Sequence, residues 1–205
     1  MIKQIEPCQH LIGPAKKTFQ IFKAKIDRGL DTPLKLLLFG PAGTGKTEVA
    51  KALATILAGD PISIQHYNGR EITLDVVRDW LPQVQTAPLF GDVMVKVIDE
   101  VDLCTVAAQD LLLSWLDKIT TTHGIIATSN LDTANLTPRF QSRFQQIKVG
   151  PPDRAAAIQF IVAKSGLTPI QSAQIINGTG VDVLDMRAAL NDAQSIRDAQ
   201  EINGI

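Results

Sequence analysis

The chain has 205 residues, and 45% of them are hydrophobic, which is typical of a folded globular protein. Its 20 basic and 21 acidic side chains give a net charge of −1, which excludes a uniformly basic surface for binding nucleic acid. We expect a cytoplasmic protein without a membrane partner, because the sequence shows neither a signal peptide nor an apolar run of membrane-spanning length.

The apolar periodicity predicts alternating helices and strands up to residue 150 and helices alone beyond it. In chain order, the first part should contain helix 16–28, strand 34–39, helix 46–58, strand 62–67, helix 74–84 (shortened or kinked by Pro82), strand 93–98, helix 105–119, strand 124–129, helix 136–144 and strand 145–149. The second part should contain helices 153–165, 168–177 and 182–200. This order predicts an α/β fold: a parallel sheet flanked by helices in residues 1–150, then a small all-helical lid in 151–205.

The cysteines and histidines show no spacing typical of a metal or redox site. Cys8 and Cys104 lie far apart in the sequence and are expected to be reduced thiols of the core. His10, His66 and His123 are likewise expected to have structural roles. No metal site built from these residue types is therefore predicted.

Residues 40–47 follow the first apolar strand and have the spacing of a P-loop. The glycines allow the backbone to curl so that successive N–H groups point at a phosphate, and the helix that follows favours anionic oxygens. Lys46 can reach the β- and γ-phosphates, and the hydroxyl of Thr47 can bind Mg²⁺. We therefore predict a nucleoside triphosphate site here rather than an ordinary glycine-rich turn. The expected contacts in this segment are Gly40, Pro41, Ala42, Gly43, Thr44, Gly45, Lys46, Thr47 and Glu48.

Two consecutive carboxylates, Asp99 and Glu100, follow a β-branched strand. Alone, this pair would fit a solvated acidic turn equally well, but the preceding P-loop favours a Walker B motif. Asp99 is then expected to hold Mg²⁺ together with Thr47, and Glu100 to orient and deprotonate the attacking water.

Polar residues after the later elements extend this prediction. Asn130 ends the fourth strand and can hydrogen-bond the water or the γ-phosphate, although an asparagine there is more often a turn residue. Arg139 and Arg143 lie four residues apart, so they are expected on one face of the short helix 136–144. The alternative for the two arginines is a solvated basic face.

The order of the remaining motifs resembles that of AAA+ ATPases, and most of all of clamp-loader (replication factor C-like) small subunits. The resemblance covers nearly the whole chain, with Phe144 standing where these subunits usually have a cysteine. It rests on Ile12-Gly13 before the first helix, Asn68, the LDVVR stretch 74–78, Ser129-Asn130, the QSRF stretch 141–144 and the DMRAAL stretch 185–190.

The resemblance implies roles for these residues. The backbone of Ile12 and Gly13 would border the adenine, and Asn68 would restrain Glu100 until a ligand arrives. Asn130 would be the first sensor residue, and Arg187 would sense the γ-phosphate from the lid. Arg143 would reach into the ATP site of a neighbouring subunit. The stripe Met186, Ala189, Leu190 and Ala193 is expected to pack inside the lid and to leave Arg187 facing the nucleotide.

The function expected from this resemblance is Mg²⁺-dependent ATP hydrolysis that acts on DNA or a DNA-bound protein assembly in replication or recombination. A sliding clamp or a helicase would be the protein partner, and Arg78, placed at the start of its helix, a candidate DNA phosphate contact. The alternatives are a helicase-loader or transposition-type AAA+ ATPase and a protein-remodelling AAA+ chaperone, for which Phe90-Gly91 is a weak pore-loop candidate.

The sequence ends soon after residues 185–190, so the helical collar of clamp loaders is expected to be absent. We therefore expect a monomer or a weak oligomer without ATP. With ATP and a partner or DNA, a nucleotide-dependent ring or spiral of identical or different subunits is expected, with Arg143 acting in trans.

Overall fold

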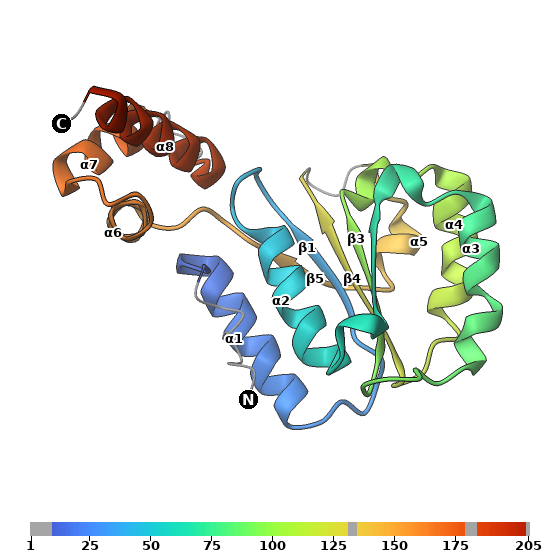
Figure 1. The fold of residues 1–205 in the computed structure, drawn as a ribbon. Helices are drawn as coiled ribbons and strands as arrows, with labels where there is room; N and C mark the ends of the chain where they lie inside the picture. Colours follow the sequence, from blue (N-terminus) through green and yellow to red (C-terminus); the bar gives the residue numbers. More distant parts are fainter. Residues whose placement is uncertain (1–9, 131–134, 179–183, 204–205) are drawn as a thin grey trace.

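The predicted strands form one parallel sheet in the computed structural model, which describes residues 10–130, 135–178 and 184–203. Within these residues the sheet has five strands in the order β2-β3-β4-β1-β5 (Figure 1). Their bounds are Lys35–Phe39 for β1, Ile64–Asn68 for β2, Met94–Asp99 for β3, His123–Ser129 for β4 and Gln145–Lys148 for β5. Because the pairs are parallel, the carboxyl ends of the strands lie along one edge, where α/β proteins bind ligands.

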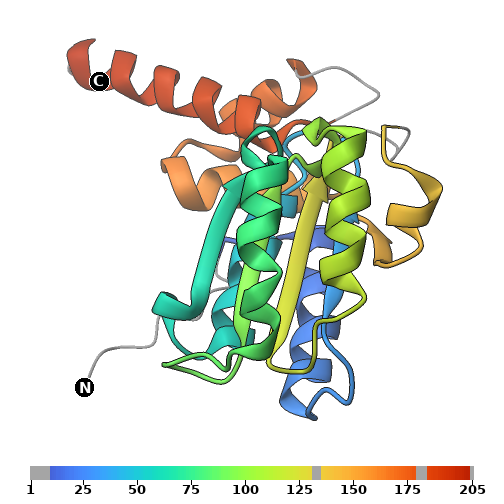
Figure 2. The same cartoon turned by 90° about the vertical axis from the view of Figure 1, so that its right-hand side faces the viewer.

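Helices cover both faces of the sheet and continue beyond it. Figures 1 and 2 show α1 and α2 on one face, α3 and α4 on the other, and α6, α7 and α8 as a separate group beside one end of the sheet. Their bounds are Gly13–Asp27 (α1), Lys46–Ala58 (α2), Leu74–Trp80 (α3), Val106–Leu116 (α4), Pro138–Gln141 (α5), Arg154–Ser165 (α6), Pro169–Gly178 (α7) and Met186–Asn203 (α8). No helix in the described ranges is long and apolar enough to cross a membrane.

The two faces of the sheet belong to two separate apolar cores. In β1, Leu37 packs with α3 and α4, whereas Leu36 and Leu38 pack with α1 and α2. β4 alternates in the same way, with Ile125 on the first face and Ile126 on the second. A strand that is buried on both faces needs an unbroken apolar run, which is what the sequence of β1 contains.

A third apolar cluster joins the helices that follow β5. It contains Ala157, Ile161, Leu167, Ile175, Ile176, Met186, Ala189 and Ala193. The clustering supports a division of the chain near residue 150, which remains a prediction. Leu190, predicted to pack in this cluster, is only half-buried and lines a cavity instead. It lies three residues after Arg187 and so shares that residue's face of α8.

Prolines explain where two helices differ from their predicted bounds. α1 begins at Gly13 rather than at residue 16, because Pro14 is compatible with the first turn of a helix. α3 ends at Trp80, and Pro82 opens a separate 3₁₀ turn, Pro82–Gln85, as expected for a residue that cannot continue the helix.

A lysine is buried within the core between the sheet and α3. Lys96 in β3 is 0% exposed, and its Nζ donates to Gln65 Oε1 at 2.5 Å and to Gln83 Oε1 at 3.2 Å. The ammonium also lies 4.3 Å from the ring centroid of Trp80, a cation–π contact. No carboxylate in the described part of the chain pairs with it, and burial lowers the pKa of Lys96 to about 8.

This depressed pKa predicts an unusual dependence of stability on pH. Between pH 8 and 10.5 the unfolded chain keeps a proton on Lys96 that the folded chain releases, so this group makes folding more favourable as the pH rises. The gain should be on the order of 1–3 kcal/mol and absent in Lys96→Met. Urea unfolding of the wild-type chain and of Lys96→Met at pH 7.5, 9 and 10.5 measures this gain in the free energy of unfolding, since the two proteins share all other titratable groups. Parallel stability curves would contradict the prediction.

Candidate nucleotide-binding site

A cavity of about 730 Å³ lies between the loop after β1 and the helical unit. Its wall is built by the segment before α1, the loop from β1 to α2, the ends of β3 and β4, and parts of α6 and α8. The predicted nucleotide contacts in this wall are Ile12, Ala42, Gly43, Thr44, Gly45, Lys46, Thr47, Glu48, Asn130 and Arg187. Asp99 and Glu100 lie in the same wall, so the fold brings the two phosphate motifs together.

Three predicted contacts do not form part of this wall: Gly13, Gly40 and Pro41. The carbonyl oxygens of Gly40 and Pro41 instead accept hydrogen bonds from Lys46 Nζ, at 3.0 and 2.6 Å. Gly13 packs so tightly that a β-carbon there would lie 2.9 Å from the α-carbon of Pro152. These residues therefore shape the backbone around the cavity rather than line it.

Lys46 is buried, with 5% exposure, at the start of α2. Burial lowers its pKa, and the nearby carboxylate of Asp99 opposes this effect. Among the described residues Lys46 Nζ hydrogen-bonds only the two loop carbonyls, so no carboxylate neutralises the ammonium directly. A polyanionic ligand in the cavity would therefore gain a strong, partly desolvated interaction with it.

Two oxygen donors suited to a magnesium ion meet at the same place. Thr47 Oγ1 donates to Asp99 Oδ1 at 2.9 Å, and the hydroxyl of Thr128 donates to the same oxygen. A hydroxyl and a carboxylate are hard oxygen ligands, which fit Mg²⁺ when phosphate oxygens and water complete its shell. The described residues contain no group of three or more His, Cys, Asp or Glu that could hold a metal by themselves.

Glu100 is held in a strained backbone conformation. Its φ is 54°, the only positive φ of a non-glycine residue in the described part of the chain. The N–H of Glu100 donates to Thr128 Oγ1 at 3.1 Å, which fixes the turn. Its carboxylate accepts hydrogen bonds from Asn130 Nδ2 at 3.0 Å and from Asn68 Nδ2 at 3.3 Å. The structure therefore joins both predicted asparagines to the predicted catalytic carboxylate.

Gly69 is a residue that was not predicted for this site. A β-carbon at this residue would lie 2.1 Å from the carbonyl oxygen of Glu100, so only glycine fits against the strained turn. Cys104 Sγ donates to the carbonyl of Gly69 at 3.2 Å, and burial raises the pKa of this thiol to about 12. Cys104 is thus an inert buried thiol as predicted, whereas Cys8 lies outside the described residues.

Gln109 is a second residue that the sequence reasoning missed. It is fully buried in α4, and its Nε2 donates to the carbonyls of Cys104 and Asn135, both at 3.1 Å. Its Oε1 accepts from the N–H of Thr137 at 2.9 Å. One amide therefore ties the turn after Glu100 to the segment that leads into α5. The sequence feature that indicates this role is a glutamine at helical spacing from Leu112, on the apolar face of its helix.

The helical unit approaches the P-loop through the N-terminus of α8. Asp185 Oδ1 caps this helix by accepting from the N–H groups of Arg187 and Ala188, at 2.8 and 3.2 Å. A β-carbon at Gly43 would lie 1.9 Å from the same oxygen, so the glycine is required where the loop meets α8. The cap also explains why α8 begins at Met186; the predicted start at residue 182 lies outside the described residues.

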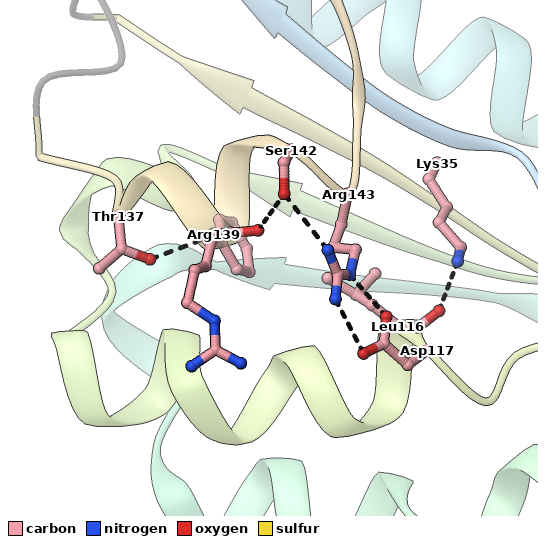
Figure 3. A network of polar contacts seen from close by, with 8 residues as sticks. Lys35, Leu116, Asp117, Thr137, Arg139, Ser142 and Arg143 are labelled. Carbon is pink, nitrogen blue, oxygen red and sulfur yellow. Dashed lines mark hydrogen bonds and ion pairs between the residues drawn. The ribbon is translucent and has the colours of Figure 1, made fainter.

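The two arginines near β5 do not share a helix face, which corrects the prediction. α5 ends at Gln141, where the chain turns, so Arg143 lies beyond the helix. Its guanidinium pairs with Asp117 at 2.6 Å, whereas Arg139 points elsewhere and has no ion pair among the described residues (Figure 3). Neither arginine lines the cavity of its own chain.

Two other predicted positions also differ from expectation. Arg78 lies in the last turn of α3 rather than at its start, and it pairs with Asp75 at 2.7 Å. Phe90 is 53% exposed and lies in the loop that enters β3, whereas the P-loop leaves β1. In a parallel sheet the loops that enter the strands and the loops that leave them lie at opposite ends of the strands, so Phe90-Gly91 is far from the cavity.

The histidines occupy three different environments. His123 is buried, and its Nε2 lies 3.1 Å from the carbonyl of Gln83, which fits the structural role predicted for it. His66 is exposed on β2. His10 lines the cavity, with Nδ1 2.5 Å from Lys164 Nζ, and its structural role stays a prediction.

A P-loop between β1 and α2, an acidic pair after β3 and a parallel sheet of this order define a P-loop nucleotide-binding protein. Residues 36–151 match the model of the ATPase family associated with various cellular activities (AAA), and the chain belongs to this family. The chain is therefore a domain of an ATPase family, as the sequence motifs predicted.

Known proteins similar to this chain include replication factor C subunits. It is 34% identical over 178 residues to the replication factor C small subunit of Methanocella arvoryzae, covering 78% of this chain and 52% of that protein. It is 29% identical over 174 residues to the probable replication factor C subunit 5 of Dictyostelium discoideum, covering 78% of this chain and 49% of that protein. The chain thus spans about half the length of these relatives. The predicted resemblance to replication factor C small subunits is confirmed.

The fold is shared with a more distant solved structure. A RuvB variant of Thermotoga maritima superposes with a TM-score of 0.72 at 19% identity, covering 94% of this chain and 64% of that one. At this identity the match bears on the fold alone, and it confirms the predicted AAA+ fold class.

Proposed function

We propose that this chain hydrolyses ATP with Mg²⁺ as the motor domain of a clamp-loader-like assembly that acts on DNA or on a DNA-bound protein assembly. The main support is the meeting of Lys46, Thr47, Asp99 and Glu100 at one wall of a single cavity. The similarity to replication factor C subunits supports a role in DNA replication or recombination.

In this proposal the chain mainly positions groups and stabilises charge. Lys46 and the loop N–H groups would hold the phosphates, and the backbone of Ile12, which lines the same cavity, would border the adenine. Thr47 and Asp99 would hold Mg²⁺, which when bound neutralises charge on the phosphate oxygens. Arg187, which lines the same cavity from the exposed start of α8, would contact the γ-phosphate.

The amide contacts of Glu100 suggest how water activation is controlled. A general base must reach the water whose proton it takes. In this structure the carboxylate is engaged by Asn68 and Asn130 instead. We propose that ligand binding releases Glu100 from Asn68, after which Glu100 accepts the proton of the water that Asn130 helps to place.

Assembly would complete the site. Arg143 lies outside the cavity of its own chain, which supports a role in the site of a neighbouring subunit. A guanidinium stays protonated and matches the charge that develops on a transferring phosphoryl group. We therefore propose a nucleotide-dependent oligomer of identical or different subunits, and slow hydrolysis by the isolated chain.

ATPase rates measured with and without primed DNA, over a range of protein concentrations, test this function. The expected result is a rate per subunit that rises with protein concentration and rises further with primed DNA. A further dependence of the rate on a sliding clamp would match the clamp-loader class. A rate that DNA raises only when a helicase, rather than a clamp, is present would indicate a helicase loader. A rate indifferent to DNA but raised by unfolded protein would contradict the proposal and favour a remodelling chaperone.

A further inference from the structure

An ion pair directly after α4 fixes the side chain of Arg143. Its Nε lies 2.6 Å from Asp117 Oδ1 and its Nη2 lies 3.2 Å from Asp117 Oδ2, so the contact is bidentate (Figure 3). The side chains of Arg143 and Asp117 are 36% and 48% exposed, and ion pairs this open contribute little to stability. The main consequence of the contact is that a long, flexible side chain is held in one orientation.

The contacts leave part of the guanidinium available. A guanidinium has five N–H groups. Two of them face Asp117, and Nη1 donates one more to Ser142 Oγ at 3.3 Å. The N–H groups that remain belong to the two terminal nitrogens, and a pair of phosphate oxygens is a suitable acceptor for them.

The surroundings of Asp117 carry an excess of positive charge. Arg143, Lys35 and Arg139 all lower the pKa of Asp117, with the hydrogen bond from Arg143 as the largest cause. Lys35 Nζ also donates to the carbonyl of Leu116 at 2.5 Å, at the C-terminal end of α4. One carboxylate therefore faces three cations, and the patch as a whole attracts an anion.

We propose that Asp117 is a positioning residue, which holds the guanidinium of Arg143 so that its terminal N–H groups meet the γ-phosphate bound by a neighbouring subunit. The inference rests on the proposed action of Arg143 in trans, and it identifies Asp117 as the residue that orients this arginine. It also separates the two arginines, because Arg139 has no comparable partner among the described residues.

Asp117→Asn tests the inference, because it keeps the size of the side chain but removes its charge and one of its two acceptors. The concentration-dependent ATPase rate at saturating ATP should fall about 10-fold, while the Kd of the isolated chain for an ATP analogue stays unchanged. Asp117→Glu should recover part of the rate. Asp110→Asn, an exposed carboxylate of the same helix α4, is the matched control and should behave as wild type.

The double variant with Arg143→Ala decides whether Asp117 acts through that arginine. In the Arg143→Ala background, Asp117→Asn should cause no further loss of rate. A loss as large as in the wild-type background, or a melting temperature lowered together with the rate, would assign Asp117 a general structural role and overturn the inference. A strong effect of Arg143→Ala with none of Asp117→Asn would overturn the inference alone. No effect of Arg143→Ala would overturn the action in trans as well.

Discussion

Replacing Glu100 with Gln is expected to leave ATP binding intact and to lower turnover by about 10²-fold or more. Gln has the size of Glu and can keep one of the two contacts that Asn68 and Asn130 make with the carboxylate. It cannot take a proton from water. Lys46 and the loop N–H groups, which would hold the phosphates, are untouched.

Single-turnover hydrolysis and the Kd for a fluorescent ATP analogue, measured on the same preparation, separate the two effects. Asp31→Asn, in the exposed loop between α1 and β1, is a suitable control for the loss of one carboxylate far from the cavity. Hydrolysis by Glu100→Gln at the wild-type rate would show that another group activates the water. If the affinity for the ATP analogue falls as strongly as the rate, the substitution has disturbed the turn at residue 100 rather than only removed the base.

The phosphate motifs could be predicted because their geometry is encoded within short stretches. Residues 40–47 contain the glycines, the lysine and the threonine in sequence, and the apolar run before them determines a strand buried on both faces. The meeting of Asp99 with Thr47 then follows from the parallel order of β1 and β3, since both strands end at the same edge.

The contacts that could not be predicted join segments far apart in the chain. Gln109 bridges three segments, and its partners could be recognised only once α4 and α5 had been placed side by side. Arg143 was expected within a helix, but α5 stops at Gln141 and Asp117 supplies a partner from 26 residues earlier. Lys96 looks like a misplaced polar residue in an apolar strand until the amides and rings around it are known.

Replacing Arg143 with Ala is expected to abolish the part of the ATPase rate that depends on protein concentration. In phosphoryl-transfer systems, an arginine supplied in trans raises the rate roughly 10³–10⁵-fold. The residual rate should therefore approach that of the isolated chain, with an unchanged Kd for nucleotide. Arg139→Ala is the matched control, because it removes one guanidinium from the same segment. Should Arg139→Ala lose the rate and Arg143→Ala keep it, the assignment of the two arginines would be reversed.

Mixing Arg143→Ala with Glu100→Gln is the most direct measurement of the central claim, that one subunit completes the active site of another. The first variant keeps its base but lacks the arginine to donate, and the second lacks the base but keeps the arginine. The mixture should therefore recover part of the ATPase rate, which neither variant shows alone. The recovered rate should be proportional to the number of sites that combine the base of one variant with the arginine of the other. If light scattering shows that the two variants assemble and no rate returns at any mixing ratio, catalysis does not depend on Arg143 acting in trans.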